Sequence, residues 1–138
     1  MKCCESKIIP RYADTDQMGI VHHAAYLPWF ETGRDDFFKK MGYSYYQLEH
    51  NGHLMPVLNI SCQYLKSAKY DEPVLLRSTL EKFKGARLSF RYELIREADL
   101  KLLSVAKIEY SITNRAYQPI NIKKTNQELW EKLNNCFN

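Results

Sequence analysis

The clearest pattern along the chain is a helical one that begins near His23 and ends at Gly42. Apolar residues and one glycine recur there at steps of three and four, a spacing that predicts an amphipathic helix with one buried face. Pro28 falls in the first turn, where its missing N–H is not needed, and Gly42 is a typical helix stop. The predicted buried stripe consists of Tyr26, Phe30, Gly33, Phe37 and Met41.

Further along the chain the period changes from helical to two. Side chains alternate between apolar and polar, which predicts β-strands. A first strand over residues 2–12 precedes the helix, a shorter amphipathic segment over residues 44–52 follows it, and a closing helix is predicted over residues 125–136 with Thr125 as its N-cap. The later strands are predicted over residues 58–64, 74–83, 88–94 and 106–113.

Each later strand has one apolar face, which must be covered by another element. The only large apolar helix in the sequence is the one that follows His23. We therefore predict an α+β fold, with a single antiparallel sheet of about five strands wrapped around one long central helix. Gly33 would let the helix and the sheet approach closely because it has no side chain. We expect residues 1–138 to form one domain.

Composition and charge exclude several classes of protein. Hydrophobic residues make up 45% of the chain, so intrinsic disorder is not expected. The net charge of +4 is mild and no dense block of lysine and arginine occurs, so we expect no nucleic-acid partner. No apolar run is long enough to cross a membrane, and the first residues lack a signal-peptide core, so we expect no membrane partner.

The cysteines give no sign of a metal site or a disulfide framework. They form no CxxC pair and no zinc-finger spacing with histidine. As ordinary thiols they are typical of a reducing compartment, and we expect a cytoplasmic protein. The four cysteines are Cys3, Cys4, Cys62 and Cys136.

Two carboxylates stand just before the predicted helix. Asp14 and Asp16 lie in a turn-rich segment that ends at Gly19. The first N–H groups of a helix have no partner within it and can hold developing negative charge. A carboxylate beside such donors suits attack on an electrophilic carbonyl, whereas the simpler interpretation is an aspartate that caps the helix or forms the turn.

A denser motif surrounds these two carboxylates. It combines the aspartates with a glycine, a histidine, a tyrosine, a Phe-Glu pair and an arginine, and Gly42 closes it. In this respect the chain resembles the hotdog-fold acyl-CoA thioesterases, most closely the 4-hydroxybenzoyl-CoA thioesterase family and its Tol-Pal-associated short-chain branch. The motif reads Tyr12-x-Asp14-Thr15-Asp16-x-x-Gly19-x-Val21-x-His23-x-x-Tyr26-Leu27-x-x-Phe30-Glu31-x-x-Arg34.

The resemblance implies a hotdog fold whose protomers join their sheets side by side, as a homodimer or homotetramer. It implies an acyl-CoA substrate at the protomer interface, with CoA as part of the substrate and no separate cofactor. Asp16 matches the catalytic carboxylate, and His23 matches a residue whose backbone N–H or ring faces the thioester oxygen. The motif residues expected to contact the substrate are Gly19, Val21, His22 and Tyr26.

Other polar residues of the motif leave alternatives open. We interpret Asp14 as structural, paired either with Arg34 or with an N–H group of the turn. Glu31 and Arg34, three residues apart on the helix, either pair with each other or serve an interface. We expect His22 to point away from His23. A metal site is not favoured, because adjacent histidines rarely bind one ion and the HxxxH spacing is missing.

The phosphate groups of CoA are bound by positively charged and hydrogen-bond-donating side chains. Several candidates lie in or next to predicted turns, where side chains can reach a nucleotide. Each one alone is more simply a solvated turn residue, but we expect some members of the set to bind phosphate. The candidates are Lys66, Ser67, Lys69, Lys84 and Arg87.

The sequence therefore predicts an enzyme that hydrolyses acyl-CoA thioesters to a carboxylic acid and free CoA. Asp16 would act as nucleophile or general base, and the helix N-terminus as oxyanion hole. An acyl-carrier-protein thioester is an alternative substrate, and a non-catalytic acyl-CoA-binding or scaffold module is an alternative function. An enoyl-CoA hydratase of the same fold is disfavoured because the spacing of Asp16 and His23 differs from its motif.

Overall fold

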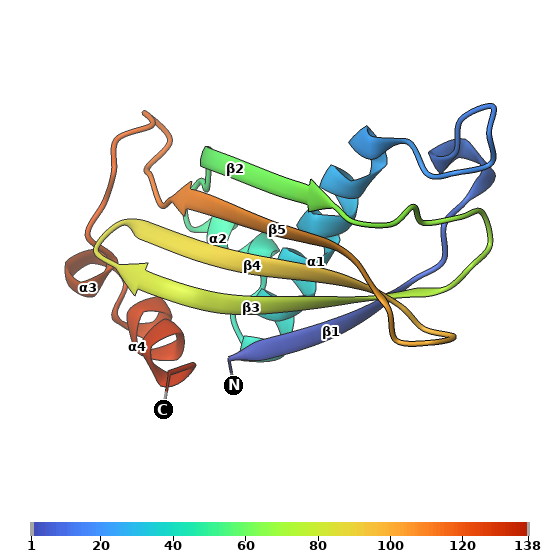
Figure 1. Cartoon of the computed structure of the whole chain (residues 1–138). Helices are drawn as coiled ribbons and strands as arrows, with labels where there is room; N and C mark the ends of the chain where they lie inside the picture. Colours follow the sequence, from blue (N-terminus) through green and yellow to red (C-terminus); the bar gives the residue numbers. More distant parts are fainter. Residues whose placement is uncertain (1, 138) are drawn as a thin grey trace.

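The computed structural model describes residues 2–137. Its main element is one antiparallel sheet of five strands in the order β1-β3-β4-β5-β2 (Figure 1). This confirms the predicted sheet and leaves β1 and β2 at its two edges. The first strand ends before Pro10, which cannot donate to a ladder, and not at residue 12. The strands are β1 (Cys3–Ile8), β2 (Val57–Tyr64), β3 (Val74–Lys84), β4 (Arg87–Arg96) and β5 (Leu102–Ser111).

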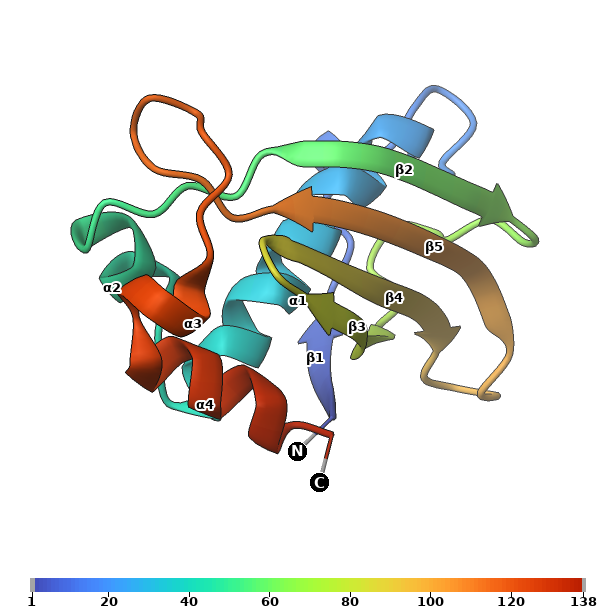
Figure 2. The same ribbon diagram turned by 90° about the vertical axis from the view of Figure 1, so that its left-hand side faces the viewer.

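The predicted central helix covers one face of this sheet. It begins with a turn of 3-10 helix, η2 (His23–Ala25), and continues as α1 (Tyr26–Met41). Gly42 ends it in the left-handed conformation, with φ of 97°. Figure 2 shows α1 lying against the sheet, whose strands curve around it. The pattern of the sequence therefore located this helix and its end correctly.

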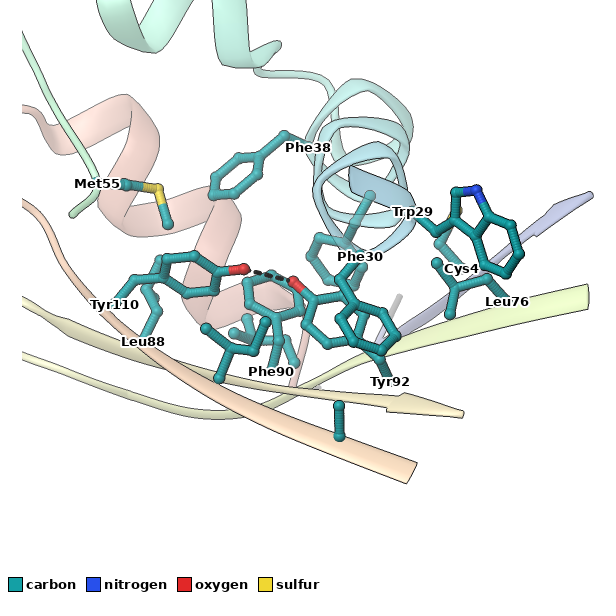
Figure 3. Packing of buried hydrophobic residues seen from close by; sticks show 14 of the residues in the cluster. Cys4, Trp29, Phe30, Phe38, Met55, Leu76, Leu88, Phe90, Tyr92 and Tyr110 are labelled. Carbon is teal, nitrogen blue, oxygen red and sulfur yellow. Dashed lines mark hydrogen bonds between the residues drawn. The ribbon is translucent and has the colours of Figure 1, made fainter. Parts of the chain in front are cut away.

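Aromatic side chains fill the space between α1 and the sheet (Figure 3). The ring of Phe30 stacks on that of Tyr92 at 5.1 Å, and the hydroxyls of Tyr92 and Tyr110 lie 2.9 Å apart. The buried face of α1 is wider than the predicted stripe, since Met41 is only half-buried while three further residues are buried. These three residues are Trp29, Arg34 and Phe38.

Gly33 is the point of closest approach between helix and sheet. A Cβ added there would overlap the hydroxyl of Ser78 and would lie 2.7 Å from Leu76, both on β3. The predicted role of this glycine is confirmed.

Apolar and polar residues alternate in β2 as in the central strands, but the apolar side chains of β2 are largely exposed. Leu58, Ile60 and Tyr64 are all more than 40% exposed. Within residues 2–137, β2 pairs with β5 alone, so its outer edge and much of its apolar surface are left uncovered by this part of the chain.

Short helices close the ends of the sheet. They are η1 (Tyr12–Asp14), α2 (Tyr45–His50), α3 (Ile122–Thr125) and α4 (Gln127–Asn135). The predicted cap of the closing helix was wrong: Thr125 ends α3, and Asn126 caps α4 by accepting a hydrogen bond from the N–H of Leu129 at 3.1 Å. Within residues 2–137, none of the helices is both long and apolar enough to span a bilayer.

Candidate active site

Asp14 is a structural carboxylate of the loop between β1 and α1. Its buried Oδ2 accepts a hydrogen bond from the backbone N–H of Arg11 at 2.9 Å, and Oδ1 accepts one from the guanidinium of Arg11 at 3.2 Å. Burial by itself raises the pKa of Asp14, but these bonds outweigh it and lower the pKa below its ordinary value. The predicted contact with a turn N–H is confirmed, whereas the alternative pairing with Arg34 is wrong.

Arg34 is instead part of the core between α1, α2 and β5. Its guanidinium lies 3.9 Å from the ring centre of Tyr45 and 5.6 Å from that of Tyr110. Its Nε and Nη2 donate to Asp35, each at 3.2 Å. The alternative in which Arg34 pairs with Glu31 is therefore wrong, because aromatic rings and Asp35 hold the cation.

Asp16 is held differently from Asp14, at the exposed tip of a tight turn. Its backbone N–H donates to the carbonyl of Ile20 at 3.0 Å, and Gly19 allows the reversal with φ of 76°. Oδ1 accepts a hydrogen bond from the N–H of Met18 at 2.8 Å. Oδ2 has no hydrogen-bond partner within residues 2–137, so the turn presents a carboxylate with one free oxygen.

The start of the helix carries one backbone donor that is free of internal bonds. The N–H of His22 donates to the carbonyl of Asp14 at 2.7 Å, and that of Ala24 to Nδ1 of His22 at 3.2 Å. The N–H groups of Ala25 and Tyr26 bond to carbonyls one turn back. In the part of the chain that the structure describes, the N–H of His23 has no such acceptor.

The two histidines lie together. Their ring centres are 4.3 Å apart with an interplanar angle of 32°, and both border the same pocket. The expectation that His22 points away from His23 was wrong, because the side chain of His22 caps the η2 turn and is thereby drawn toward the pocket.

The segment after β2 forms the opposite wall. The N–H of Val21 donates to the carbonyl of Ala68 at 2.8 Å, and the N–H of Ala68 donates to the hydroxyl of Tyr26 at 3.3 Å. The hydroxyl of Tyr64 donates to the carbonyl of His23 at 3.2 Å. These bonds join two segments more than forty residues apart in the sequence, and the pocket lies between them.

This pocket has a volume of about 280 Å³. It contains Asp16 and His23 together with three of the predicted substrate contacts of the motif and two of the predicted phosphate contacts. The ten lining residues are Asp16, Ile20, Val21, His22, His23, Tyr26, Tyr64, Leu65, Lys66 and Ser67.

Sequence reasoning missed Ile20, Tyr64 and Leu65 as lining residues. A signal for Tyr64 existed, because the alternation in residues 58–64 places it last on the apolar face of its strand, directly before Leu65 and Lys66. Nothing local indicated that this strand ends beside His23.

Four predicted contacts lie outside the pocket lining. Gly19 forms the turn behind Asp16, and Lys69 pairs through its backbone with Ile20. Lys84 and Arg87 belong to the β3–β4 hairpin at the opposite end of the sheet (Figure 1). On β5, Arg87 pairs with position 111 and Tyr64 with position 104, a separation of roughly 23 Å at about 3.3 Å per residue. A single chain therefore does not bring these two cations to its own pocket.

The tyrosines of the pocket stay protonated at neutral pH. Partial loss of water around the phenol of the half-exposed Tyr64, with smaller contributions from Cys62 and Tyr26, raises the pKa of Tyr64 to about 12. Burial also raises the pKa of Tyr26. Both phenols therefore act as hydrogen-bonding groups in the pocket wall, and neither is a base at neutral pH.

Comparison with known proteins identifies the family. The family model described as the thioesterase-like superfamily matches residues 10–125, which include the whole motif and all ten lining residues of the pocket. The chain belongs to this superfamily. The narrower likeness to a Tol-Pal-associated branch stays a prediction.

Relatives of this thioesterase-like chain agree with the assignment. YneP of Bacillus subtilis, a candidate acyl-CoA thioesterase, is 32% identical over 124 residues, which is 90% of each chain. YbgC of Haemophilus influenzae, an acyl-CoA thioesterase, is 28% identical over 98 residues, which is 70% of this chain and 72% of that protein.

Solved structures give the same fold. The DHNA-CoA thioesterase of Staphylococcus aureus superposes with a TM-score of 0.92 at 30% identity, over 98% of this chain and 91% of that one. A 4-hydroxybenzoyl-CoA thioesterase, at 15% identity, superposes with a TM-score of 0.80 over 88% of this chain and 94% of that one, which shows the shared fold. The predicted hotdog fold is confirmed.

Proposed function

We propose that this protein hydrolyses acyl-CoA thioesters, with Asp16 as the catalytic carboxylate and the backbone N–H of His23 as oxyanion donor. The observation that carries the proposal is that one pocket is lined by both Asp16 and His23. Within residues 2–137, Oδ2 of Asp16 and the backbone N–H of His23 have no hydrogen-bond partner. Asp14, whose oxygens are both bonded by Arg11, offers no such group. The names of the relatives support the same reaction class.

Two routes to the same products fit these groups. In the first, an oxygen of Asp16 attacks the thioester carbonyl, CoA leaves as a thiolate that takes up a proton, and water then cleaves the acyl-aspartyl anhydride. In the second, Asp16 takes a proton from a water molecule that attacks directly. In both, the carbonyl oxygen gains charge, and one well-placed N–H donor stabilises it by about 2.7–4 kcal/mol.

The pocket favours a compact acyl group, either aromatic or short. The ring of Tyr26 stacks on Trp29 at 5.2 Å, and its hydroxyl is bonded to Ala68, so the space between α1 and the sheet is closed behind it. The side chains of Tyr64, His22 and His23 give the remaining walls an aromatic character. The S. aureus relative, which by its name acts on DHNA-CoA, is consistent with an aromatic acyl group.

The edge strand β2 supports a homodimer. Its outer edge pairs with no other strand of residues 2–137 and carries exposed apolar side chains, including Leu58 and Ile60. This combination favours pairing with the strand of another chain. Antiparallel pairing of two β2 strands would place the start of one beside the end of the other. The β3–β4 hairpin of one subunit, with Lys84 and Arg87, would then lie at the same end as the pocket of its partner. A tetramer would be built from such dimers.

The decisive experiment measures release of free CoA from a panel of short, long, branched and aromatic acyl-CoAs. We expect wild-type turnover of at least one compact substrate, and a loss of about two orders of magnitude or more in Asp16→Asn. Asp71→Asn is the matched control, because it removes an exposed turn carboxylate outside the pocket. Full turnover by Asp16→Asn would exclude the assignment of the catalytic group.

The same panel, extended by matching thioesters of acyl carrier protein, distinguishes the alternative functions. Faster turnover of an acyl group on acyl carrier protein than on CoA would favour that substrate. Absence of turnover with every acyl-CoA, together with measurable CoA binding, would favour a non-catalytic binding module.

A further inference from the structure

Two lysines, Lys66 of the pocket lining and Lys101, lie close enough for their side chains to interact. Lys66 follows β2 and lines the pocket beside Ser67, while Lys101 directly precedes β5. The N–H groups of Leu65 and Lys66 both donate to the carbonyl of Leu103, at 2.8 and 3.0 Å. These bonds hold the end of β2 against the start of β5, two residues from Lys101.

The charge around this pair is unbalanced. Neither lysine forms an ion pair with a carboxylate of residues 2–137. Asp99, whose charge acts on Lys66 in the opposite direction, is already engaged by Arg96, whose Nε lies 3.5 Å from it. The direct contact with Lys101, and to a smaller extent the charge of Arg96, lower the pKa of the exposed Lys66. An anion between the two ammonium groups would relieve this repulsion.

We propose that Lys66 and Lys101 together bind a phosphate group of the CoA moiety, an inference that rests on the function proposed above. A phosphate offers several acceptor oxygens and can accept hydrogen bonds from both ammonium groups at once. Lys66 connects this anion site to the pocket, because the same residue borders Asp16's cavity and faces Lys101. Sequence reasoning had included Lys66 among the phosphate contacts but not Lys101.

The test compares thioesters that share an acyl group but differ in phosphates: acyl-CoA, its analogue without the 3′-phosphate, and the N-acetylcysteamine thioester. For Lys66→Ala/Lys101→Ala we expect KM for acyl-CoA to rise about tenfold, and KM for the phosphate-free thioester to rise much less. The analogue without the 3′-phosphate shows which phosphate is bound. If the lysines bind the 3′-phosphate, wild type and the double alanine variant should have the same KM for this analogue. The conservative variant Lys66→Arg/Lys101→Arg should restore the low KM, and Lys39→Ala, an exposed cation of the last turn of α1, should behave as wild type.

Two results would overturn the inference. One is an equal rise of KM for the phosphate-free thioester, and the other is a KM for acyl-CoA that does not change in the double alanine variant. If the wild-type protein hydrolyses no thioester, the proposed function is wrong, but the phosphate site can still be tested. Calorimetry with CoA then measures whether Lys66 and Lys101 contribute to binding. In that case, a Kd for CoA about tenfold weaker in the double variant supports the site, whereas an equal Kd or no binding excludes it.

Discussion

The hydroxyl of Tyr64 donates a hydrogen bond of 3.2 Å to the carbonyl oxygen of His23. The bond joins the end of the edge strand β2 to the helical turn in which the free N–H of His23 lies. The ring of Tyr64 also packs 5.0 Å from that of Tyr26. The position of the proposed oxyanion donor is therefore set partly by a residue of the sheet edge.

We predict that Tyr64→Phe lowers kcat by about three- to tenfold, the equivalent of one hydrogen bond of roughly 1 kcal/mol, with little change in KM. The ring and its packing remain, so only the position of the η2 turn is affected. Steady-state kinetics on the best acyl-CoA measure the effect. Tyr70→Phe, which alters an exposed tyrosine of the neighbouring loop, is the control. An unchanged kcat in Tyr64→Phe would exclude the positioning role.

We expect substitution of Asp14 to affect folding stability and substitution of Asp16 to affect catalysis. We predict that Asp14→Asn destabilises folding by about 1–3 kcal/mol, because it weakens bonds to a buried carboxylate, while Asp16→Asn leaves stability nearly unchanged. Since the pKa of Asp14 is lowered in the folded state, its contribution is complete above the unfolded pKa of about 4 and is lost as pH falls through the folded pKa. Urea unfolding from pH 7 to pH 3 should show the difference between wild type and Asp14→Asn become smaller as the pH falls.

His53 should make folding sensitive to mild acid. Its buried ring is 3.0 Å from Nδ2 of Asn126, the cap of α4, and burial lowers its pKa. The unfolded state therefore takes up the proton first, so stability is complete above the unfolded pKa of about 6.5 and decreases as pH falls through it toward the folded pKa. We predict a lower Tm at pH 5.5 than at pH 7.5 in wild type.

His53→Gln keeps an acceptor for Asn126 but does not titrate. Its Tm should change less between the two pH values than that of wild type. An equal change in both proteins would assign the acid sensitivity to other groups.

Gly33→Ala should destabilise the protein by about 1–3 kcal/mol through overpacking, because the new Cβ would meet Ser78 and Leu76. The hydroxyl of Ser78 is buried and has no hydrogen-bond partner among the residues that the structure describes, so Ser78→Ala alone should destabilise folding little. The double variant tests the contact directly: adding Ser78→Ala should recover part of the loss, as measured by urea unfolding. Strictly additive effects would mean that Leu76 or the backbone accounts for the strain.

A charged residue introduced on β2 should dissociate the proposed dimer into monomers. We predict that Ile60→Lys shifts the molar mass in light scattering from dimer to monomer and lowers turnover, since it places a charge on an apolar pairing surface. Tyr46→Lys, at an exposed aromatic residue of α2, should leave the mass unchanged. A wild-type protein that is itself monomeric would exclude pairing through β2.

The sequence by itself determined the central helix and its stop at Gly42, the alternating strands, and the motif that contains Asp16 and His23. These features are local, because helical and strand periodicities report which face of each element is apolar. The same periodicity was misleading for β2, since an edge strand and a central strand carry the same alternation.

Only the tertiary structure decided which residues meet. It brought Tyr64 to His23, Lys101 to Lys66, and Asn126 to His53, and it placed Lys84 and Arg87 at the far end of the sheet. It also showed that Asp14 is hydrogen-bonded to Arg11, whereas one oxygen of Asp16 has no partner within residues 2–137. Each of these outcomes depends on strand order and on packing between distant segments, and no spacing along the chain encodes a contact between residues that are distant in sequence.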